Sequence, residues 1–163
     1  MIESRIRSIE AAHIGALIEL AETTNLSPWT AQSYLDEIRD ARSIMLRLET
    51  PGNAAIGFVI GRIVAAADDE NAVDADIYNI AVSLTEQKRG HGQRLLDEFL
   101  TKCKLSHVRA VWLEVRESND TAISFYKRNG FLAVTTRRHF YTNPPEHALL
   151  MRLDLSLRKS PGE

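Results

Sequence analysis

The stretch of sequence that decides the fold is Gln87-Lys88-Arg89-Gly90-His91-Gly92-Gln93-Arg94. Before it, the apolar run from Ile77 to Val82 predicts a strand, and after it the apolar spacing from Gly92 to Lys104 predicts a helix. Two glycines one residue apart let the backbone curve closely around a ligand, and the N–H groups that open a helix attract phosphate oxygens. A tight turn without a ligand explains the paired glycines equally well, so the surrounding residues have to decide.

Two common nucleotide-binding motifs do not match this stretch. A Rossmann fingerprint needs a third glycine at the position where this chain has Leu95. A Walker loop needs Gly-Lys followed by Ser or Thr, and the chain contains no such combination. If the stretch binds phosphate, it does so as a loop of another kind.

The spacing of apolar residues in the rest of the chain predicts a mixed α/β domain. Strands are expected at residues 3–9, Ser43–Leu48, Ala54–Ala66, Ile77–Val82, Val108–Val115, Phe131–His139 and His147–Leu155. Helices are expected at Ala11–Ala21, after a cap at Thr30, at Gly92–Lys104 and at Asn119–Asn129. This order predicts a single domain over residues 1–155, with helices flanking a central, mixed and mostly antiparallel sheet. A polar tail at residues 156–163 is expected to fray.

Two turns have a stereochemical basis. Thr50-Pro51-Gly52-Asn53 joins two of the predicted strands as a hairpin, because Pro51 restricts its own φ and Gly52 permits the positive φ that follows. Gly130 stands at the end of a predicted helix, where a left-handed residue is favoured.

Composition and charge exclude several classes of protein. The chain has 163 residues, of which 44% are hydrophobic and 26% charged, as in an ordinary globular domain and unlike a disordered chain. Its longest apolar run, Ala54 to Gly61, is far shorter than the ~20 residues of a membrane-spanning helix, and its N-terminus lacks the apolar centre of a signal peptide. A net charge of −2 is unlike the basic domains that bind nucleic acid. We therefore expect a cytoplasmic protein that binds neither membranes nor nucleic acid.

One short stretch is strongly acidic and contains neither Lys nor Arg. Its carboxylates are Asp68, Asp69, Glu70, Asp74 and Asp76. Runs of charge usually lie in solvated loops, which is the first interpretation. The second interpretation is an acidic rim that attracts a basic substrate.

Two side chains have the character of a base and an acid. Glu114 interrupts an apolar strand and shares a face with Trp112, and apolar neighbours remove water from a carboxylate, which favours a general base near neutral pH. Alternatively, Glu114 faces water on an edge strand. Tyr126 lies on a predicted helix, either as a core aromatic with a hydrogen-bonded hydroxyl or as a proton donor.

Taken together, these segments resemble the GNAT superfamily of acetyl-CoA-dependent N-acetyltransferases. The segments similar to its conserved blocks are Gln87-x-x-Gly90-x-Gly92, which matches the pyrophosphate signature, and Asn119, Phe125-Tyr126 and Asn129-Gly130-Phe131. Within the superfamily the chain resembles the RimI group of protein N-terminal alanine acetyltransferases. That closer likeness lies in Asn79-Ile80-Ala81-Val82, Trp112-Leu113-Glu114-Val115-Arg116, Ser118-Asn119, Arg137-Arg138 and Pro28-Trp29. The resemblance extends to about Leu155 and implies the GNAT fold.

The resemblance also implies roles for individual residues. Backbone groups of Ile80, Ala81 and Val82 are expected to hold the acetyl and pantetheine portion of acetyl-CoA, with one N–H polarising the thioester carbonyl. The residues expected to contact the coenzyme elsewhere are Lys88, Arg89, Gly90, His91, Gly92 and Gln93, through main-chain N–H groups on the pyrophosphate, and Asn119. Glu114 is expected to deprotonate the acceptor amine, directly or through water, and Tyr126 to protonate the CoA thiolate.

No metal ion is expected, because the chemistry needs none and the five histidines lack ligand spacing. Cys103 lies on the apolar face of a predicted helix, which favours a core residue over an acyl-carrying nucleophile. Acetyl transfer is therefore expected to occur directly, in a ternary complex of protein, acetyl-CoA and acceptor.

The resemblance implies an acceptor as well: the N-terminal alanine of a small-subunit ribosomal protein, followed by basic residues. Two segments depart from the group, since Ala65 to Asp76 is longer and more acidic and the Asn143-Pro144-Pro145 loop is shorter. Candidate acceptor contacts are Trp29, Phe140 and Tyr141. A small-molecule amine or an internal lysine is the alternative acceptor, and a non-catalytic acetyl-CoA sensor is the alternative of another class.

Overall fold

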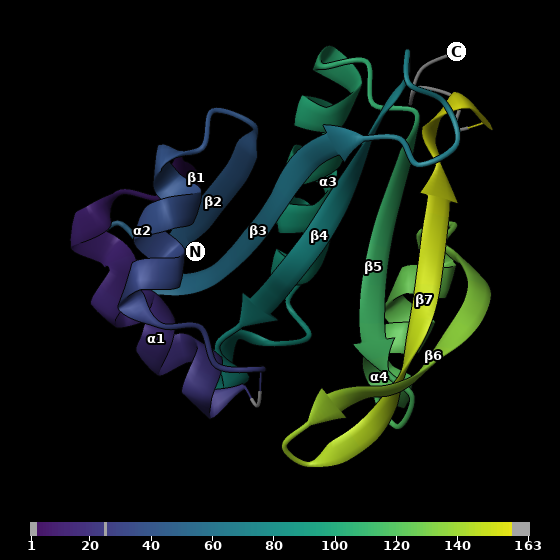
Figure 1. Cartoon of the computed structure of the whole chain (residues 1–163). Coiled ribbons are helices and arrows are strands. Elements are labelled where there is room, and N and C mark those ends of the chain that lie inside the picture. Colours follow the sequence, from purple (N-terminus) through teal and green to yellow (C-terminus); the bar gives the residue numbers. More distant parts are fainter. Residues whose placement is uncertain (1–2, 25, 158–163) are drawn as a thin grey trace. The chain divides into compact units, whose positions relative to one another are not determined.

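The computed structural model describes residues 3–24 and 26–157, and within them it has seven strands and four α-helices (Figure 1). The strands are β1 (Arg5–Ser8), β2 (Ser43–Glu49), β3 (Ala55–Ala65), β4 (Val73–Val82), β5 (Ala110–Arg116), β6 (Leu132–Thr142) and β7 (Pro145–Asp154). The helices are α1 (Ile14–Thr23), α2 (Ala31–Arg39), α3 (His91–Leu105) and α4 (Asp120–Arg128), with short 3-10 helices η1 (Ala11–His13), η2 (Leu84–Glu86) and η3 (Leu155–Leu157).

The chain forms two compact units. The first unit comprises Met1–Arg62 and Tyr78–Cys103, and the second comprises Ile63–Ile77 and Lys104–Glu163. Strands β3 and β4 contribute residues to both units, and hydrogen bonds join the strands in the order β1-β2-β3-β4-β5-β7-β6. The expected fold class, helices with a mixed and mostly antiparallel sheet, is confirmed. The expectation of one domain over residues 1–155 stays a prediction.

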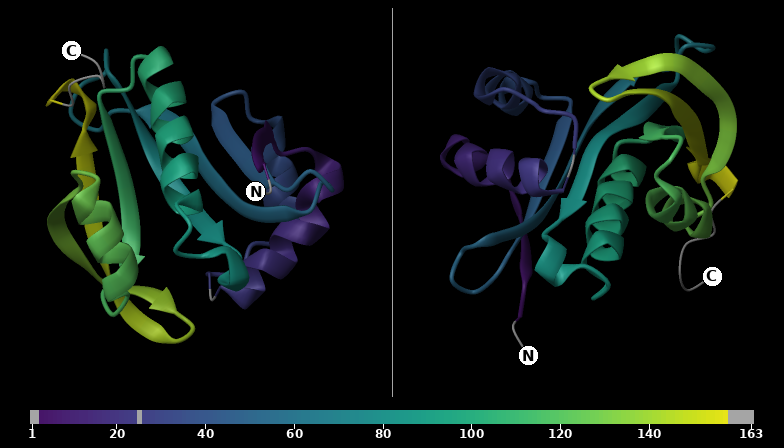
Figure 2. Two further views of the ribbon diagram at one scale, coloured as in Figure 1. Left: turned by 180° about the vertical axis from the view of Figure 1, so that it is seen from behind. Right: turned by 90° about the horizontal axis from the view of Figure 1, so that it is seen from below.

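In the first unit, helices cover both faces of the strands. Strands β1, β2 and β3 are antiparallel; α1 and α2 lie side by side on one face and α3 lies on the other (Figure 2). Alternating strand residues supply the core beneath α1 and α2, among them Met45, Phe58 and Ile60. The apolar face expected for α3 is buried, with Leu95, Leu96, Phe99, Leu100 and Cys103 inside.

The turn between β2 and β3 corrects one expectation. The N–H of Asn53 donates to the carbonyl oxygen of Thr50 at 2.8 Å, so the predicted hairpin turn is present. The positive φ falls on Asn53, at 63°, and not on Gly52. A hairpin loop can place a left-handed residue after a tight turn, and asparagine tolerates that conformation because its short polar side chain bonds locally. The hairpin prediction is confirmed, and the assignment of the positive φ to Gly52 is wrong.

In the second unit, β4 runs parallel to β5, while β5, β7 and β6 are antiparallel to their neighbours. Helix α4 covers one face of these strands (Figure 2). Leu113 and Val115 are buried and occupy alternate positions of β5, so they share one face of that strand. Gly130 follows α4 with a φ of 92°, as expected, and an added Cβ there would lie 3.2 Å from Cδ1 of Leu153.

The acidic stretch is not a solvated loop throughout. Strand β4 begins at Val73, so Asp74 and Asp76 belong to a strand, and Asp74 is only 3% exposed. The solvated-loop interpretation is correct for the exposed residues 68–70 and wrong for these two carboxylates. The alternation of apolar and acidic residues from Val73 to Ile77 is a strand pattern that the density of charge concealed.

The remaining expectations concern the C-terminus and membranes. Residues 158–163 of the expected tail lie outside the described residues, and the chain before them forms η3. Among the helices that the structure describes, none is long and apolar enough to cross a membrane.

The cap of α2 yields a prediction about stability. Oγ1 of Thr30 accepts the N–H of Ser33 at 3.1 Å, as the sequence predicted. Thr30→Ala leaves this N–H without its partner, and we expect a loss of about 1 kcal/mol in the free energy of unfolding. Thermal unfolding followed by circular dichroism should show a lower midpoint for Thr30→Ala and a nearly unchanged midpoint for Thr30→Ser. Equal midpoints for all three proteins would contradict the capping role.

Candidate active site

The glycine stretch forms a concave backbone segment at the start of α3. Lys88 and Gly90 are left-handed, with φ of 61° and 81°, and a left-handed residue beside a right-handed one turns successive N–H groups to one side. Helix α3 begins at His91, and its first N–H groups have no carbonyl partner within the helix. No acidic side chain lies in the first turn of α3, so the helix dipole is free to favour an anion. The segment therefore fits a diphosphate.

Both acidic and basic side chains lie around this segment. Oε2 of Glu86 lies 3.5 Å from Nη1 of Arg89 and 3.5 Å from Nε2 of His91. Nδ1 of His91 is buried and has no hydrogen-bond partner among the described residues. Lys88 and Arg89 are exposed, which leaves two cations beside the candidate anion-binding backbone.

Two residues that the sequence analysis gave no role shape the end of β4. Nε2 of Gln87 donates to the carbonyl oxygen of Val82 at 3.0 Å and so ties the strand to the loop. A Cβ added to Gly57 in β3 would lie 2.9 Å from the carbonyl oxygen of Ala81, closer than such contacts come. The approach of β3 to Ala81 therefore requires glycine. Gln87 stood in the quoted motif, whereas no local pattern marks Gly57.

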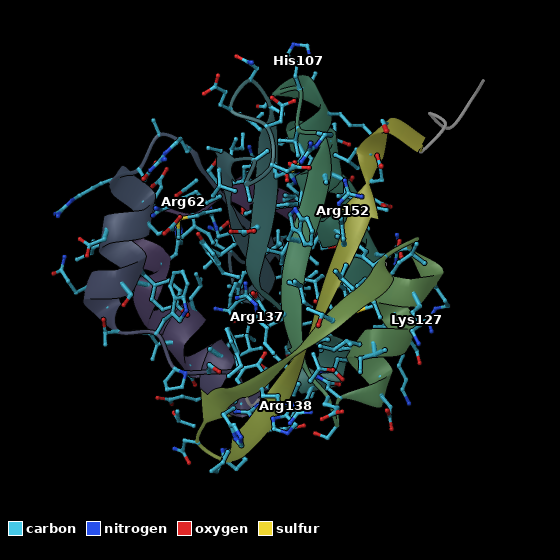
Figure 3. All side chains as sticks on the ribbon, turned by 45° about the vertical axis from the view of Figure 1, so that its right-hand side comes forward. Arg62, His107, Lys127, Arg137, Arg138 and Arg152 are labelled. Atoms are coloured by element: carbon cyan, nitrogen blue, oxygen red, sulfur yellow. The ribbon has the colours of Figure 1, made fainter. Side chains whose placement is uncertain are left out.

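Glu114 lies in β5 and pairs with Leu150 of β7 on one side. On the other side the pairs between β4 and β5 end at Leu113, one residue before Glu114. At Glu114 itself, β5 therefore has a strand partner on one side, as the edge interpretation expected. Oε1 of Glu114 accepts from Nη1 of Arg137 at 2.9 Å, and Figure 3 labels Arg137 on β6. The Glu114 side chain is 26% exposed, so the carboxylate has a cationic partner and some solvent as well as the expected neighbour on its face, Trp112. The pairing with Arg137 depends on the β5–β7–β6 register, which the sequence did not reveal.

An ionic network around the buried Asp74 orients Trp112. Asp74 accepts from Nε and Nη2 of Arg109 at 3.2 and 3.1 Å and from Nε1 of Trp112 at 3.0 Å. Nη2 of Arg109 also donates to Asp68 at 2.7 Å, and the Arg152 guanidinium lies 5.4 Å from the Trp112 ring centroid. Asp74 thus has a structural role: its charge is paired with Arg109, and its bond from Nε1 of Trp112 holds the indole beside Glu114.

Tyr126 is almost fully buried in α4, with an exposed fraction of 6%. Its ring centroid lies 5.4 Å from that of Phe125 and 5.5 Å from that of Phe131, so the ring is a core aromatic, as one interpretation held. Burial raises the pKa of Tyr126 well above its ordinary value of 10.0. The phenol is therefore protonated at neutral pH, which is the state that a hydrogen donor needs.

Two further polar residues have partners within the second unit. Oδ1 of Asn119 accepts the N–H of Ala122 at 3.1 Å and caps α4, a role that needs no ligand. The Arg116 guanidinium lies 4.1 Å from the ring centroid of Tyr141, and burial raises the pKa of this partly buried tyrosine. Contact between Asn119 and a coenzyme stays a prediction.

The candidate residues divide between the two units. The first unit contains Ile80, Ala81, Val82, Lys88, Arg89, Gly90, His91, Gly92 and Gln93, and the second contains Glu114, Asn119 and Tyr126. Of the candidate acceptor contacts, Trp29 lies in the first unit, with its ring centroid 5.8 Å from that of Tyr78. Phe140 and Tyr141 lie in the second unit, with ring centroids 5.0 Å apart.

Cys103 is fully buried in α3, which agrees with a core residue. Burial raises the pKa of the Cys103 thiol to about 12. Among the described residues, no three His, Cys, Asp or Glu side chains gather in a way that could hold a metal ion.

Known proteins resemble this chain over nearly its whole length. The sequence profile of the acetyltransferase (GNAT) family matches residues 14–131. The ribosomal protein bS18-alanine N-acetyltransferase of Escherichia coli K12 is 31% identical over 154 residues, which cover 93% of this chain and 98% of that protein. The enzyme of the same name from Haemophilus influenzae is 35% identical over 151 residues, covering 91% and 97%.

Solved structures agree with these sequence matches. The crystal structure of the ribosomal-protein-S18-alanine N-acetyltransferase from Escherichia coli superposes with a TM-score of 0.81 at 28% sequence identity. The match covers 99% of each chain. The expected fold is thereby confirmed by a protein of known structure.

The buried thiol yields a prediction about reactivity. Because the pKa of Cys103 is raised to about 12, almost no thiolate exists near pH 8, and the side chain is shielded as well. Iodoacetamide should alkylate the native protein roughly 100-fold or more slowly than the protein unfolded in guanidinium, measured by intact mass. Incubation with acetyl-CoA should leave no acetyl thioester on this residue. Alkylation at equal rates in the two states would contradict the core assignment.

Proposed function

The chain belongs to the acetyltransferase (GNAT) family, whose members take the acetyl group from acetyl-CoA, and we propose that it acetylates the N-terminal α-amine of a protein. The acceptor we propose is the N-terminal alanine of a small-subunit ribosomal protein in which basic residues follow. The observation that carries this proposal is the end-to-end similarity to two bacterial enzymes that bear the name of that reaction.

In this proposal the first unit binds the coenzyme. The diphosphate accepts hydrogen bonds from the N–H groups between Lys88 and Gln93, where left-handed residues and the start of α3 direct donors to one side. The exposed Lys88 and Arg89 side chains add positive charge. A backbone N–H within Ile80–Val82 polarises the thioester carbonyl and stabilises the oxyanion that forms on attack.

The second unit provides the base and the acid. A peptide α-amine has a pKa of ~7.7–8.0, so much of it is an ammonium at neutral pH and must lose a proton before it attacks. Glu114 accepts this proton, directly or through one water molecule, and its bond from Arg137 holds the carboxylate in place. Tyr126 is the donor to the leaving sulfur because its phenol stays protonated.

The atoms balance without a covalent enzyme intermediate. The amine nitrogen forms a C–N bond to the thioester carbon after Glu114 has taken the first proton. When the oxyanion collapses, the C–S bond breaks, the thiolate takes the phenolic hydrogen of Tyr126, and the second nitrogen proton restores the phenol. The products are the amide, the thiol of CoA and one proton, which Glu114 releases to water. The inaccessible Cys103 agrees with direct transfer in a ternary complex.

Product mapping tests the proposed function. The substrates are a basic peptide that begins Ala-Arg, the same peptide with a blocked N-terminus, and variants that begin with Ser or Met. After incubation with acetyl-CoA, we expect mass spectrometry to find acetyl on the free alanine amine and none on the blocked peptide. Acetyl on an internal lysine would replace the proposed acceptor with a side-chain amine. Coenzyme binding without any acetylated peptide would favour a small amine or a sensor.

The proposed donor predicts the effect of removing one oxygen atom. Tyr126→Phe keeps the buried ring and deletes the hydroxyl, so we expect kcat to fall roughly 100-fold or more while the KM for acetyl-CoA changes little. Tyr34→Phe is the matched control, because Tyr34 is also buried, at 1% exposed, and has no proposed role in the reaction. Its turnover should equal that of the unaltered protein.

The pH profile provides a second readout for this donor. Since burial raises the pKa of Tyr126 above 10.0, the phenol should cause no loss of kcat between pH 7 and 10. Unchanged turnover in Tyr126→Phe would show that this residue is not the donor.

A further inference from the structure

Among the five clustered carboxylates, Asp76 is placed differently from the others. In the parallel β4–β5 register Asp76 lies opposite Trp112, and Glu114 is two residues further along β5. Paired residues of neighbouring strands point to the same face of a sheet, and so do residues two apart in one strand. Asp76, Trp112 and Glu114 therefore share one face of the second unit, opposite the face to which the buried Leu113 and Val115 of β5 belong.

The charges around Asp76 are already paired with other groups. Arg109 bonds to Asp74 and Asp68, and Arg137 bonds to Glu114. Asp76 itself has no hydrogen bond and no ion pair among the described residues, although it is partly buried. The charged groups that act on it are Glu114, Asp74 and Arg137, of which two are negative.

Such a carboxylate is unfavourable in the free protein. Burial first, and then the charges of Glu114 and Asp74, raise the pKa of Asp76 above its ordinary value. To be stable in its charged form, a carboxylate in this position needs a neighbouring group that carries a positive charge and donates a hydrogen bond. Because its oxygens are only partly buried, a ligand can supply both.

The acceptor supplies this cation. Its α-amine arrives largely as an ammonium, with three N–H donors and one positive charge, and an ammonium pairs well with an unpartnered carboxylate. Glu114, the base on the same face, has a direct ion pair with Arg137, whereas Asp76 has none among the described residues and is influenced by Arg137 only through space.

We propose that Asp76 is the residue that binds the protonated α-amine of the acceptor and holds it beside Glu114, which then removes the proton. The proposal rests on the proposed function, since it assigns the binding of the same amine. It separates two tasks that one carboxylate would otherwise share: Asp76 binds the ammonium and keeps its charge, and Glu114 accepts the proton.

A pair of peptides measures ammonium binding without turnover. One is the Ala-Arg peptide, and the other is the same peptide with a propionyl group in place of alanine, so that it lacks only the amine. Calorimetric titrations are made with the protein saturated by CoA, which has no acetyl group to transfer. We expect the unaltered protein to bind the amine peptide roughly ten-fold or more tightly than the propionyl peptide, as a charge-assisted hydrogen bond would require.

Two variants assign this preference to one carboxylate. Asp76→Asn keeps the shape and removes the charge, and the ten-fold ratio should fall to about one, with a raised peptide KM. Glu114→Gln should lose turnover by roughly 100-fold or more and still prefer the amine peptide. An unchanged ratio in Asp76→Asn, or no preference in the unaltered protein, would overturn the proposal.

A stability measurement separates binding from a structural role. Because Asp76 has no hydrogen bond or ion pair to lose among the described residues, Asp76→Asn without ligand should unfold at the same temperature as the unaltered protein or at a higher one. A clearly lower midpoint would mean that Asp76 supports the fold, which contradicts the proposal.

Further peptides distinguish ammonium binding by Asp76 from binding of the basic side chain, and distinguish failure of this proposal from failure of the proposed function. Replacing Arg by Gln at the second position should lower affinity equally in the unaltered protein and in Asp76→Asn. If the loss instead disappears in Asp76→Asn, the residue binds the basic side chain and the proposal is wrong. If the unaltered protein prefers the amine peptide but never acetylates it, the proposed function fails while the ammonium site remains.

Discussion

A carboxylate that is buried away from water needs cations and hydrogen-bond donors around it. In the second unit this requirement applies to Asp74, and the bonds that satisfy it determine how the neighbouring charges pair. Asp74 is 3% exposed and takes its bonds from Arg109 and Trp112. These bonds join the start of β4 to β5 and orient the indole. They also occupy Arg109, while Asp76, two residues along the strand, has no ion pair among the described residues.

Each unit carries groups that suit a charged ligand. In the first unit, the left-handed Lys88 and Gly90 turn N–H groups to one side at the start of α3. In the second unit, Asp76 has no ion pair among the described residues. Groups of this kind cost stability, and proteins keep them at sites that bind ligands. The N–H groups suit an anion and the carboxylate suits a cation, which in the proposed reaction are the diphosphate of acetyl-CoA and the ammonium of a peptide.

The sequence predicted the elements well wherever short-range patterns determine them. The face of α3 around Phe99, the cap at Thr30 and the left-handed Gly130 all depend on residues within one or two turns of the chain, and all three are confirmed. Two expectations from the same kind of pattern are wrong: the density of acidic residues concealed the strand alternation around Asp74, and the positive φ assigned to Gly52 falls on Asn53.

By itself the sequence determined the family and the order of elements, and it singled out the candidate phosphate-binding segment at Gly90 and the two candidate reactive residues, Glu114 and Tyr126. Each of these follows from adjacent residues or from a regular spacing of residues along the chain. The tertiary structure decided which charge pairs with which: Arg137 with Glu114, Arg109 with Asp74, and neither with Asp76. Such pairs join residues that are 23 to 35 positions apart and that meet only through strand register, so no local pattern encodes them.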